Sequence, residues 1–203
     1  MFRRKRATPL NGTSTTHKST TPIQAQSTYT LFLEVHHRNE LSLGDNRRRL
    51  GFSAYHWSIL LFDKENNRFH VYDITDGSSQ DRLKRCELNP DHEWTYRVKS
   101  DVNPDACESR LIRMTIGEVS DGLGPETIKD LILSVPLPIK GAVPAQGAIT
   151  WIKMVLCMLR RHGYAPEFGD VEMVVARALA YADLRLAHLE DSVGFIDYLG
   201  NQV

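Results

Sequence analysis

The chain has 203 residues, of which 41% are hydrophobic and 25% charged, and its formal net charge is zero; this composition is typical of one globular domain and excludes a chain that is disordered throughout. Its three cysteines lack zinc-ligand spacing and exclude a disulfide scaffold, so a reducing compartment is expected, with the cytoplasm as the predicted location. No run of 18 apolar residues occurs, so no membrane-spanning helix is expected.

Residues 1–28 are predicted to form a disordered basic tail. This segment contains the run Arg3-Arg4-Lys5-Arg6, many serine and threonine residues and few large apolar side chains. It cannot bury enough surface to offset the entropy lost on folding. A solvated tail is the simplest interpretation, and a nuclear or mitochondrial address is the alternative. Because the rest of the chain is acidic overall, no nucleic-acid-binding face is expected.

Strand patterns dominate the first half of the single domain predicted over residues 29–203. Alternating or β-rich runs predict strands over residues 29–35, 55–63, 68–74, 94–99 and 110–119. The run Lys64-Glu65-Asn66-Asn67 predicts a four-residue hairpin turn. That turn pairs Asp63 with Arg68 and places His70 opposite Leu61.

Helical patterns take over near residue 125. Pro125 suits a first helical turn, residues 149–161 and 171–190 show apolar side chains at helical spacing, and His162-Gly163 is typical of a helix C-terminus. Three prolines between residues 136 and 144 predict a loop. Strands first and helices afterwards indicate an α+β domain, with an antiparallel β-sheet and helices packed on one side.

Three positions combine into a candidate active site. His56 opens the first strand of the hairpin, His70 lies on the returning strand, and a helix begins near Ala148. A helix N-terminus offers unpaired backbone N–H groups and a positive dipole end, which lower the pKa of a thiol and hold an oxyanion. Two histidines facing such a terminus suit cysteine-based acyl chemistry.

The segment from residue 56 to about residue 185 resembles the permuted branch of the papain-like cysteine hydrolases. That branch includes the NlpC/P60-related enzymes and the lecithin retinol acyltransferase-like proteins, and small fungal proteins with the same motif order are still more similar. The matching motifs are His56-Trp57, His70 and Gly147-Ala148-Ile149-Thr150-Trp151. The resemblance implies a permuted papain-like fold with a cleft between the His56 strand and the helix start. It also implies that Trp57, Gly147 and Trp151 line a site for a small acyl- or peptide-like ligand or a protein partner.

The resemblance places the nucleophile at position 148, where this chain has alanine. A methyl group cannot replace an attacking thiolate, and Cys157 lies about 13 Å further along the helix. The resemblance therefore implies either a natural pseudoenzyme or an engineered Cys-to-Ala variant of a thiol-dependent hydrolase or acyltransferase. In an active parent, His56 would be the general base and His70, or another polar side chain, would orient it.

The predicted hairpin separates the two histidines. With Asp63 paired to Arg68, His56 and His70 lie about 17 Å apart along the strands and on opposite faces of the sheet. His56 is therefore the stronger candidate for the cleft. Each histidine also suits a structural role, and Trp57 and Trp151 also suit positions in the core.

Two functions of other classes stay open. The first is a structural or protein-interaction module without a small-molecule site, for which the surface at the expected cleft would be filled. The second is a non-thiol acid–base enzyme, which requires Asp73 or Asp76 within hydrogen-bond reach of a histidine. Both aspartates also suit the end of a strand and its turn.

No cofactor or metal is expected. His36 and His37 follow Glu34, but adjacent strand residues point to opposite faces and do not favour a shared metal ion. The run Gly122-Leu123-Gly124-Pro125 lacks the glycine spacing and the lysine of a phosphate-binding loop. The predicted partners are a small ligand or a protein, without nucleic acid and without a membrane span.

Overall fold

The computed structural model describes residues 27–78, 80–81, 86–103, 107–120, 124–165, 170–187 and 194–197. The tail predicted over residues 1–28 lies outside this part of the chain, apart from its last two positions, which belong to the first strand. Among the described helices, none combines the length and the apolar composition needed to cross a lipid bilayer.

Six strands form the central sheet: β1 (Ser27–His37), β2 (Tyr55–Asp63), β3 (Arg68–Thr75), β6 (Thr95–Lys99), β7 (Arg110–Ser120) and β8 (Gly194–Asp197). Their spatial order is β6-β3-β2-β1-β7-β8. The first five are antiparallel neighbours, and β8 pairs parallel to β7. A separate small ladder joins the strands β4 (Gln80–Asp81) and β5 (Cys86–Glu87).

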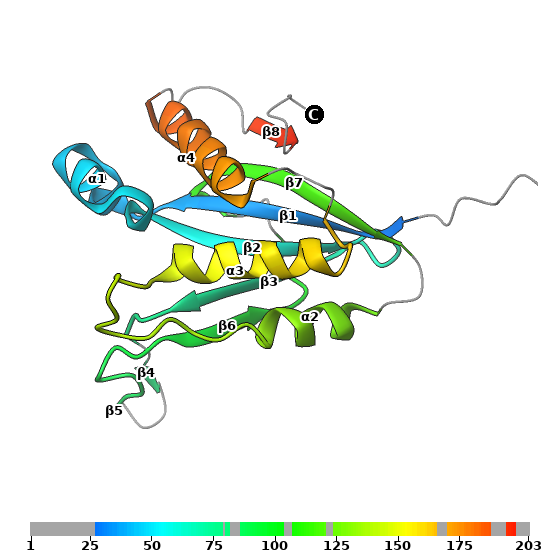
Figure 1. Ribbon diagram of the computed structural model, residues 1–203, viewed down its shortest axis with the longest axis horizontal. Helices are drawn as coiled ribbons and strands as arrows, with labels where there is room; N and C mark the ends of the chain where they lie inside the picture. Colours follow the sequence, from blue (N-terminus) through cyan, green and yellow to red (C-terminus); the bar gives the residue numbers. More distant parts are fainter. Residues whose placement is uncertain are drawn as a thin grey trace, which may run out of the picture.

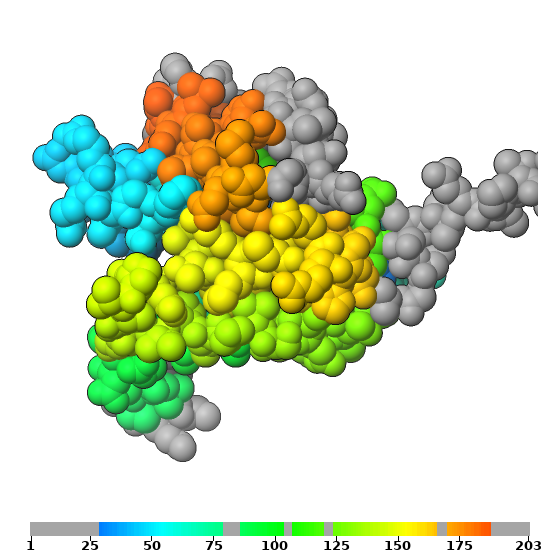
Figure 2. All heavy atoms as spheres, in the orientation of Figure 1, coloured from blue at the N-terminus to red at the C-terminus, as the bar shows by residue number. Residues whose placement is uncertain are grey.

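Three helices, α2 (Pro125–Leu133), α3 (Ala148–Arg161) and α4 (Val171–Ala187), lie on one face of the sheet (Figure 1). Helix α3 contacts β2 and β3, and α4 contacts β1 and β7. Figure 2 shows the molecule from this side, where the three helices cover the strands. The predicted α+β class, an antiparallel sheet with helices packed on one side, is confirmed.

The two-residue period of the strands decides which side chains the helices cover. On β1, Leu33 and Val35 are fully buried in the apolar core beneath the helices. Their neighbours Glu34 and His36 therefore point to the other face. The strand β2 repeats the pattern, and its core side chains are Tyr55, Trp57, Ile59 and Leu61. Each buried aliphatic side chain contributes roughly 1.5–3 kcal/mol to this packing.

The β2–β3 hairpin has the predicted register. Asp63 pairs with Arg68, and Leu61 pairs with His70. The Asp63 carboxylate accepts hydrogen bonds from two backbone N–H groups of the turn, which holds the turn at this length. His56 and His70 therefore lie well apart along the hairpin and on opposite faces of the sheet, as the predicted turn requires.

Helix α3 ends as the sequence predicts. Gly163 has a φ of +75°, a left-handed conformation that glycine adopts without steric strain. Its N–H donates to the carbonyl of Arg160, which satisfies one of the last carbonyl groups of the helix.

The sequence pattern does not predict helix α1 (Gly44–Leu50), because none of its seven residues is buried. The helix is flanked by the 3-10 turns Asn39–Ser42 and Gly51–Ala54. Arg47 of α1 donates two hydrogen bonds to the Asp183 carboxylate of α4. This ion pair and the packing of Leu50 against the core hold α1 against the rest of the domain.

None of the helices α2–α4 covers the opposite face of the sheet, which we call the open face. At one end of this face, Phe62 and Phe69 stack with ring centroids 4.3 Å apart, and the Arg113 guanidinium lies over Phe32 and Phe69. Arg113 Nε donates to Glu34 at 2.7 Å, and both side chains are 4% exposed. This buried ion pair marks the border between the aromatic end of the open face and its polar part.

Replacement of Leu33 by alanine tests the packing of the helix-covered face. Leu33 is fully buried at the centre of β1, so the change leaves a cavity and should lower the free energy of unfolding by about 2–5 kcal/mol. Urea denaturation followed by tryptophan fluorescence measures the loss. Leu184→Ala is the matched control, because Leu184 is 55% exposed and its loss should cost about 0.5 kcal/mol or less. Equal effects of the two changes would contradict the assigned faces.

Candidate functional site

A pocket with a volume of about 310 Å³ opens on the polar part of the open face. Its walls come from β1, β2, β3, β6 and the segment between β6 and β7, so residues far apart in the sequence meet there. The lining side chains are Glu34, His36, His37, His56, Ser58, Val71, Asp73, Arg97, Lys99, Val102, Cys107 and Ser109. The volume is at the lower end of the range for ligand sites, which suits a small molecule.

A thiol–imidazole pair lies in this pocket. Cys107 Sγ is 3.5 Å from Nδ1 of His36 and 3.3 Å from the hydroxyl of Ser109. The contact forms because β7 pairs with β1: Arg110 at the start of β7 lies opposite His36, and the His37 N–H donates to the Ser109 carbonyl. Cys107 is exposed, so a ligand in the pocket can reach its sulfur.

The second ring nitrogen of His36 faces a carboxylate. His36 Nε2 is 3.4 Å from Oε2 of Glu34 and 3.3 Å from the hydroxyl of Ser58. Glu34 precedes His36 by two residues on one strand, so both side chains share the open face. Glu34 is 3% exposed, and its other oxygen accepts the hydrogen bond from Arg113. Glu34 and Ser58 therefore hold the imidazole with Nδ1 toward the thiol.

These contacts favour a charged thiol–imidazole pair. The hydrogen bond from His36 outweighs partial burial and lowers the pKa of the Cys107 thiol from 9.0 to about 6. Burial disfavours the charged form of His36, but its hydrogen bonds to Cys107 and Glu34 prevail and raise its pKa from 6.5 to about 9. Burial also opposes the charge of Glu34, yet His36 and Arg113 hold the pKa of this carboxyl below its usual value. Between about pH 6 and about pH 9, the pair is therefore a thiolate and an imidazolium.

A second ion-paired cluster lies in the same pocket. Asp73 is 3% exposed, its Oδ2 is 3.4 Å from Nε2 of His56, and both of its oxygens accept hydrogen bonds from Arg97, at 2.7 and 3.0 Å. Burial opposes the charge of Asp73, but His56 and Arg97 keep its pKa below the usual value. The rings of His36 and His56 have centroids 6.0 Å apart, so the two clusters are neighbours. The interpretation of Asp73 as a turn residue is wrong, because its carboxylate is engaged across the sheet.

The sheet separates His56 from the helix start at Ala148. Trp57, next to His56 on β2, is buried in the helix-covered core, so His56 points to the open face and lines the pocket there. Ala148 packs against the core from the helix side. The expectation of one cleft between His56 and Ala148 is therefore wrong for the described residues, because neighbouring side chains of a strand point to opposite faces.

The other residues expected at the site also lie outside the pocket. His70 lies opposite the core residue Leu61, so its side chain is on the helix side of the sheet. Trp57 and Trp151 are 1% and 0% exposed, so both are core anchors. A side chain at Gly147 would meet the ring of Trp94 at 3.8 Å. Of the six residues predicted for the site, His56 is the one that lines the open-face pocket.

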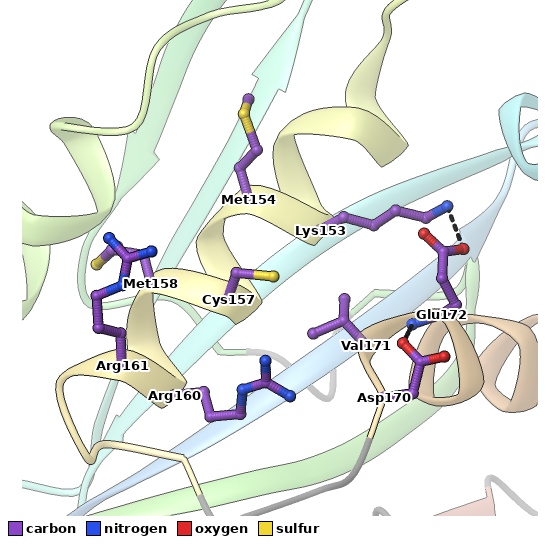
Figure 3. A pocket seen from close by; sticks show the side chains of 9 residues that line it. All are labelled: Lys153, Met154, Cys157, Met158, Arg160, Arg161, Asp170, Val171 and Glu172. Carbon is purple, nitrogen blue, oxygen red and sulfur yellow. Dashed lines mark hydrogen bonds and ion pairs between the residues drawn. The ribbon is translucent and has the colours of Figure 1, made fainter.

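A second hollow lies on the helix side, between α3 and the start of α4 (Figure 3). Its volume is about 490 Å³, and Lys153 and Glu172 form an ion pair at its edge, at 2.6 Å. Figure 3 shows Cys157 pointing toward Val171. The described residues that line this hollow include no histidine, so Cys157 lacks the base that Cys107 has. The open-face pocket is therefore the better candidate for chemistry.

The described side chains do not outline a metal centre. Within the part of the chain that the structure describes, no group of three or more histidine, cysteine, aspartate or glutamate residues is arranged to hold a metal ion. The groups that the open-face pocket offers to a ligand are a thiol, imidazoles, hydroxyls and charged side chains.

Comparison of the chain with known protein families, with curated proteins and with solved structures found no match. The resemblance to the permuted papain-like hydrolases rests on the short motifs at His56-Trp57, His70 and residues 147–151. It stays a prediction.

The sequence contains part of the signal for the open-face site. Glu34 and His36 are two residues apart on a strand, a spacing that places both on one face. Cys107 carries no such signal, because it lies in an irregular segment. Its approach to His36 depends on the pairing of β1 with β7.

The pH dependence of thiol alkylation tests the Cys107–His36 pair. In a Cys86→Ala/Cys157→Ala background, Cys107 is the single thiol. The rate of its reaction with iodoacetamide should rise with a midpoint near pH 6, because the thiolate is the reacting form. His36→Gln removes the partner and should move the midpoint upward, toward 9.0.

The midpoint is the proper measure in this experiment. A thiolate of lower pKa is also less nucleophilic, which offsets part of the gain in rate at any single pH. A midpoint that does not move in His36→Gln would contradict the pairing.

Ala148→Cys tests the site that the resemblance implies. On the helix side the introduced thiol has no contact with His56, so it should not transfer acyl groups, and His56→Ala should leave its alkylation unchanged. Both rates are measured in a protein whose three natural cysteines are replaced by alanine. Acyl transfer by the introduced thiol that disappears in His56→Ala would reinstate the cleft expected between these positions.

Proposed function

We propose that the protein is a thiol-dependent hydrolase or acyltransferase whose nucleophile is Cys107 in the open-face pocket. The observation that carries the proposal is the 3.5 Å contact of Cys107 Sγ with His36 Nδ1, while Glu34 faces Nε2 of the same ring. A nucleophile beside a base that a third group orients is the arrangement used by enzymes that form covalent acyl intermediates.

In acylation, the Cys107 thiolate attacks the carbonyl carbon of a thioester, ester or amide. An S–C bond forms, and the negative charge moves to the carbonyl oxygen. The Ser109 hydroxyl lies 3.3 Å from Sγ, close enough to donate a hydrogen bond to that oxygen. The leaving group then departs with the proton from Nδ1 of His36, which leaves an acyl thioester on Cys107 and a neutral imidazole.

In deacylation, the neutral His36 acts as the base. Once Cys107 is esterified, its negative charge no longer favours the imidazolium, so the pKa of His36 falls. Nδ1 accepts a proton from water or another acceptor, whose oxygen or nitrogen attacks the thioester carbonyl. The C–S bond breaks and the thiolate returns. Water as the acceptor gives hydrolysis, and any other acceptor gives acyl transfer.

The proposal keeps the chemical class implied by the resemblance and changes the nucleophile. Alanine at position 148 does not make the chain a pseudoenzyme if the thiol is supplied by Cys107 on the other face of the sheet. A permuted papain-like order of elements is part of the proposal, without the cleft between the His56 strand and the helix start. It is supported by the order of strands before helices and by the start of α3 at Ala148.

A non-thiol acid–base enzyme is the second candidate, because it requires an aspartate within reach of a histidine and the pocket contains such a pair. Asp73 Oδ2 lies 3.4 Å from His56 Nε2. In this alternative, His56 oriented by Asp73 is the general base for an attacking water, and Cys107 takes no part in the reaction.

Acylation of Cys107 separates the two candidates. Cys107→Ala should lower hydrolysis or transfer of N-acetylcysteamine thioesters by roughly 10³-fold or more. Intact-protein mass spectrometry of the wild type should detect an acyl adduct, and peptide mapping should place it on Cys107. Cys157→Ala is the matched control, because it removes another exposed cysteine on the helix side and should leave activity and adduct unchanged.

The other outcomes are equally informative. Activity that persists in Cys107→Ala and is lost in Asp73→Asn would assign the function to the acid–base candidate. A wild-type protein that forms no adduct and turns over no thioester, ester or amide would contradict both enzymatic proposals and favour an interaction module.

A further inference from the structure

We propose that the acyl group handled by this pocket ends in a carboxylate, which Lys99 and Arg97 bind at a distance from the reacting carbonyl. The inference rests on the proposed thiol chemistry and adds the substrate class, which is a thioester, ester or amide of one carboxyl group of a short dicarboxylic acid.

The pocket has a reactive end and a cationic end. Cys107 precedes β7 and contacts His36 on β1, whereas Arg97 and Lys99 lie on β6, on the far side of β2 and β3. Arg97 and Lys99 are two residues apart on one strand, so both side chains share the open face. Cys107, His36, Arg97 and Lys99 all line the pocket, and β2 and β3 form the floor between its two ends. An acyl group on Cys107 can therefore extend toward the two basic side chains.

Among the described residues, the positive charges of Arg97 and Lys99 exceed the negative charge of Asp73 at the cationic end. Asp73 compensates Arg97 through the Nε and Nη2 atoms of the guanidinium, which leaves Nη1 to donate to a ligand. Lys99 has no acidic side chain within ion-pair distance in the described part of the chain. A carboxylate from the ligand would supply the missing negative charge and accept charge-assisted hydrogen bonds from both residues.

The separation of the two ends limits the length of the acyl chain. The centroids of the His36 and His56 rings are 6.0 Å apart, and Nη2 of Arg97 is 3.1 Å from His56 Nε2. The cationic end therefore lies on the order of 10 Å from the thiol, which fits an acyl chain of about five or six carbons. Val71 and Val102 provide apolar contacts for the methylene groups between the ends.

Two thioesters that differ at one end test the inference. Glutaryl and pentanoyl N-acetylcysteamine thioesters have equal chain length, but the first ends in a carboxylate and the second in a methyl group. Wild-type protein should prefer the glutaryl thioester by about tenfold or more in kcat/KM. Lys99→Met should remove most of this preference, and Lys99→Glu should reverse it. Lys153→Met, the same change at an ion-paired lysine on the helix side, should keep it.

A second readout does not depend on turnover. In the Cys86→Ala/Cys157→Ala background, glutaramate should protect Cys107 from iodoacetamide, whereas the uncharged pentanamide should not, and Lys99→Glu should abolish the protection. Equal turnover of the two thioesters together with no protection would overturn the inference and leave the proposed thiol chemistry intact. A protein that forms no adduct and turns over no thioester, ester or amide would refute the proposed function, and the protection by glutaramate would then decide the carboxylate site alone.

Discussion

The alternation of side chains along β1 is the constraint on which the core and the pocket both depend. Leu33 and Val35 are fully buried beneath the helices, so Glu34 and His36 have to face the other side. A shift of one residue would move a carboxylate and an imidazole into an apolar core and expose two large aliphatic side chains, at a cost of several kcal/mol. The register that builds the core therefore also aligns the groups of the pocket.

Burial of Glu34 is what makes the imidazole of His36 a well-oriented partner for the thiol. A lone carboxylate in this position would be strongly destabilised, and Arg113 from the neighbouring strand β7 compensates it at 2.7 Å. Because Arg113 is itself enclosed by aromatic rings, the carboxylate has little freedom to turn. Preorganised charges of this kind favour a charged transition state without reorganisation during the reaction.

The sequence predicts those parts of the molecule that local patterns determine. The strand β2 and the helix α3 follow from their apolar periods, and the β2–β3 register follows from four polar turn residues. The short elements α1, β4, β5 and β8 are not predicted, because seven or fewer residues are too few to show a repeating apolar pattern.

The site could be predicted only in part, since its main contact joins residues that are distant in the chain. Cys107 and His36 are 71 residues apart and meet through the β1–β7 ladder, which has a register shift between Val35 and His36. The side of the sheet on which His56 lies could, by contrast, be predicted. Trp57 beside it is a large apolar residue that takes the core position, so His56 has to lie on the open face. The short motifs of the resemblance predict a site on the helix side instead.

The arrangement of the layers also separates the surfaces on which substitutions act. The contacts of α3 and α4 with the sheet, and of α2 with α3, hold the fold, while the pocket proposed for chemistry lies on the uncovered side of the same strands. Stabilising changes in the helix layer can therefore accumulate without altering the shape of the pocket. A redesigned protein could gain thermal resistance on one side and a new ligand preference on the other, with the strands as the shared scaffold.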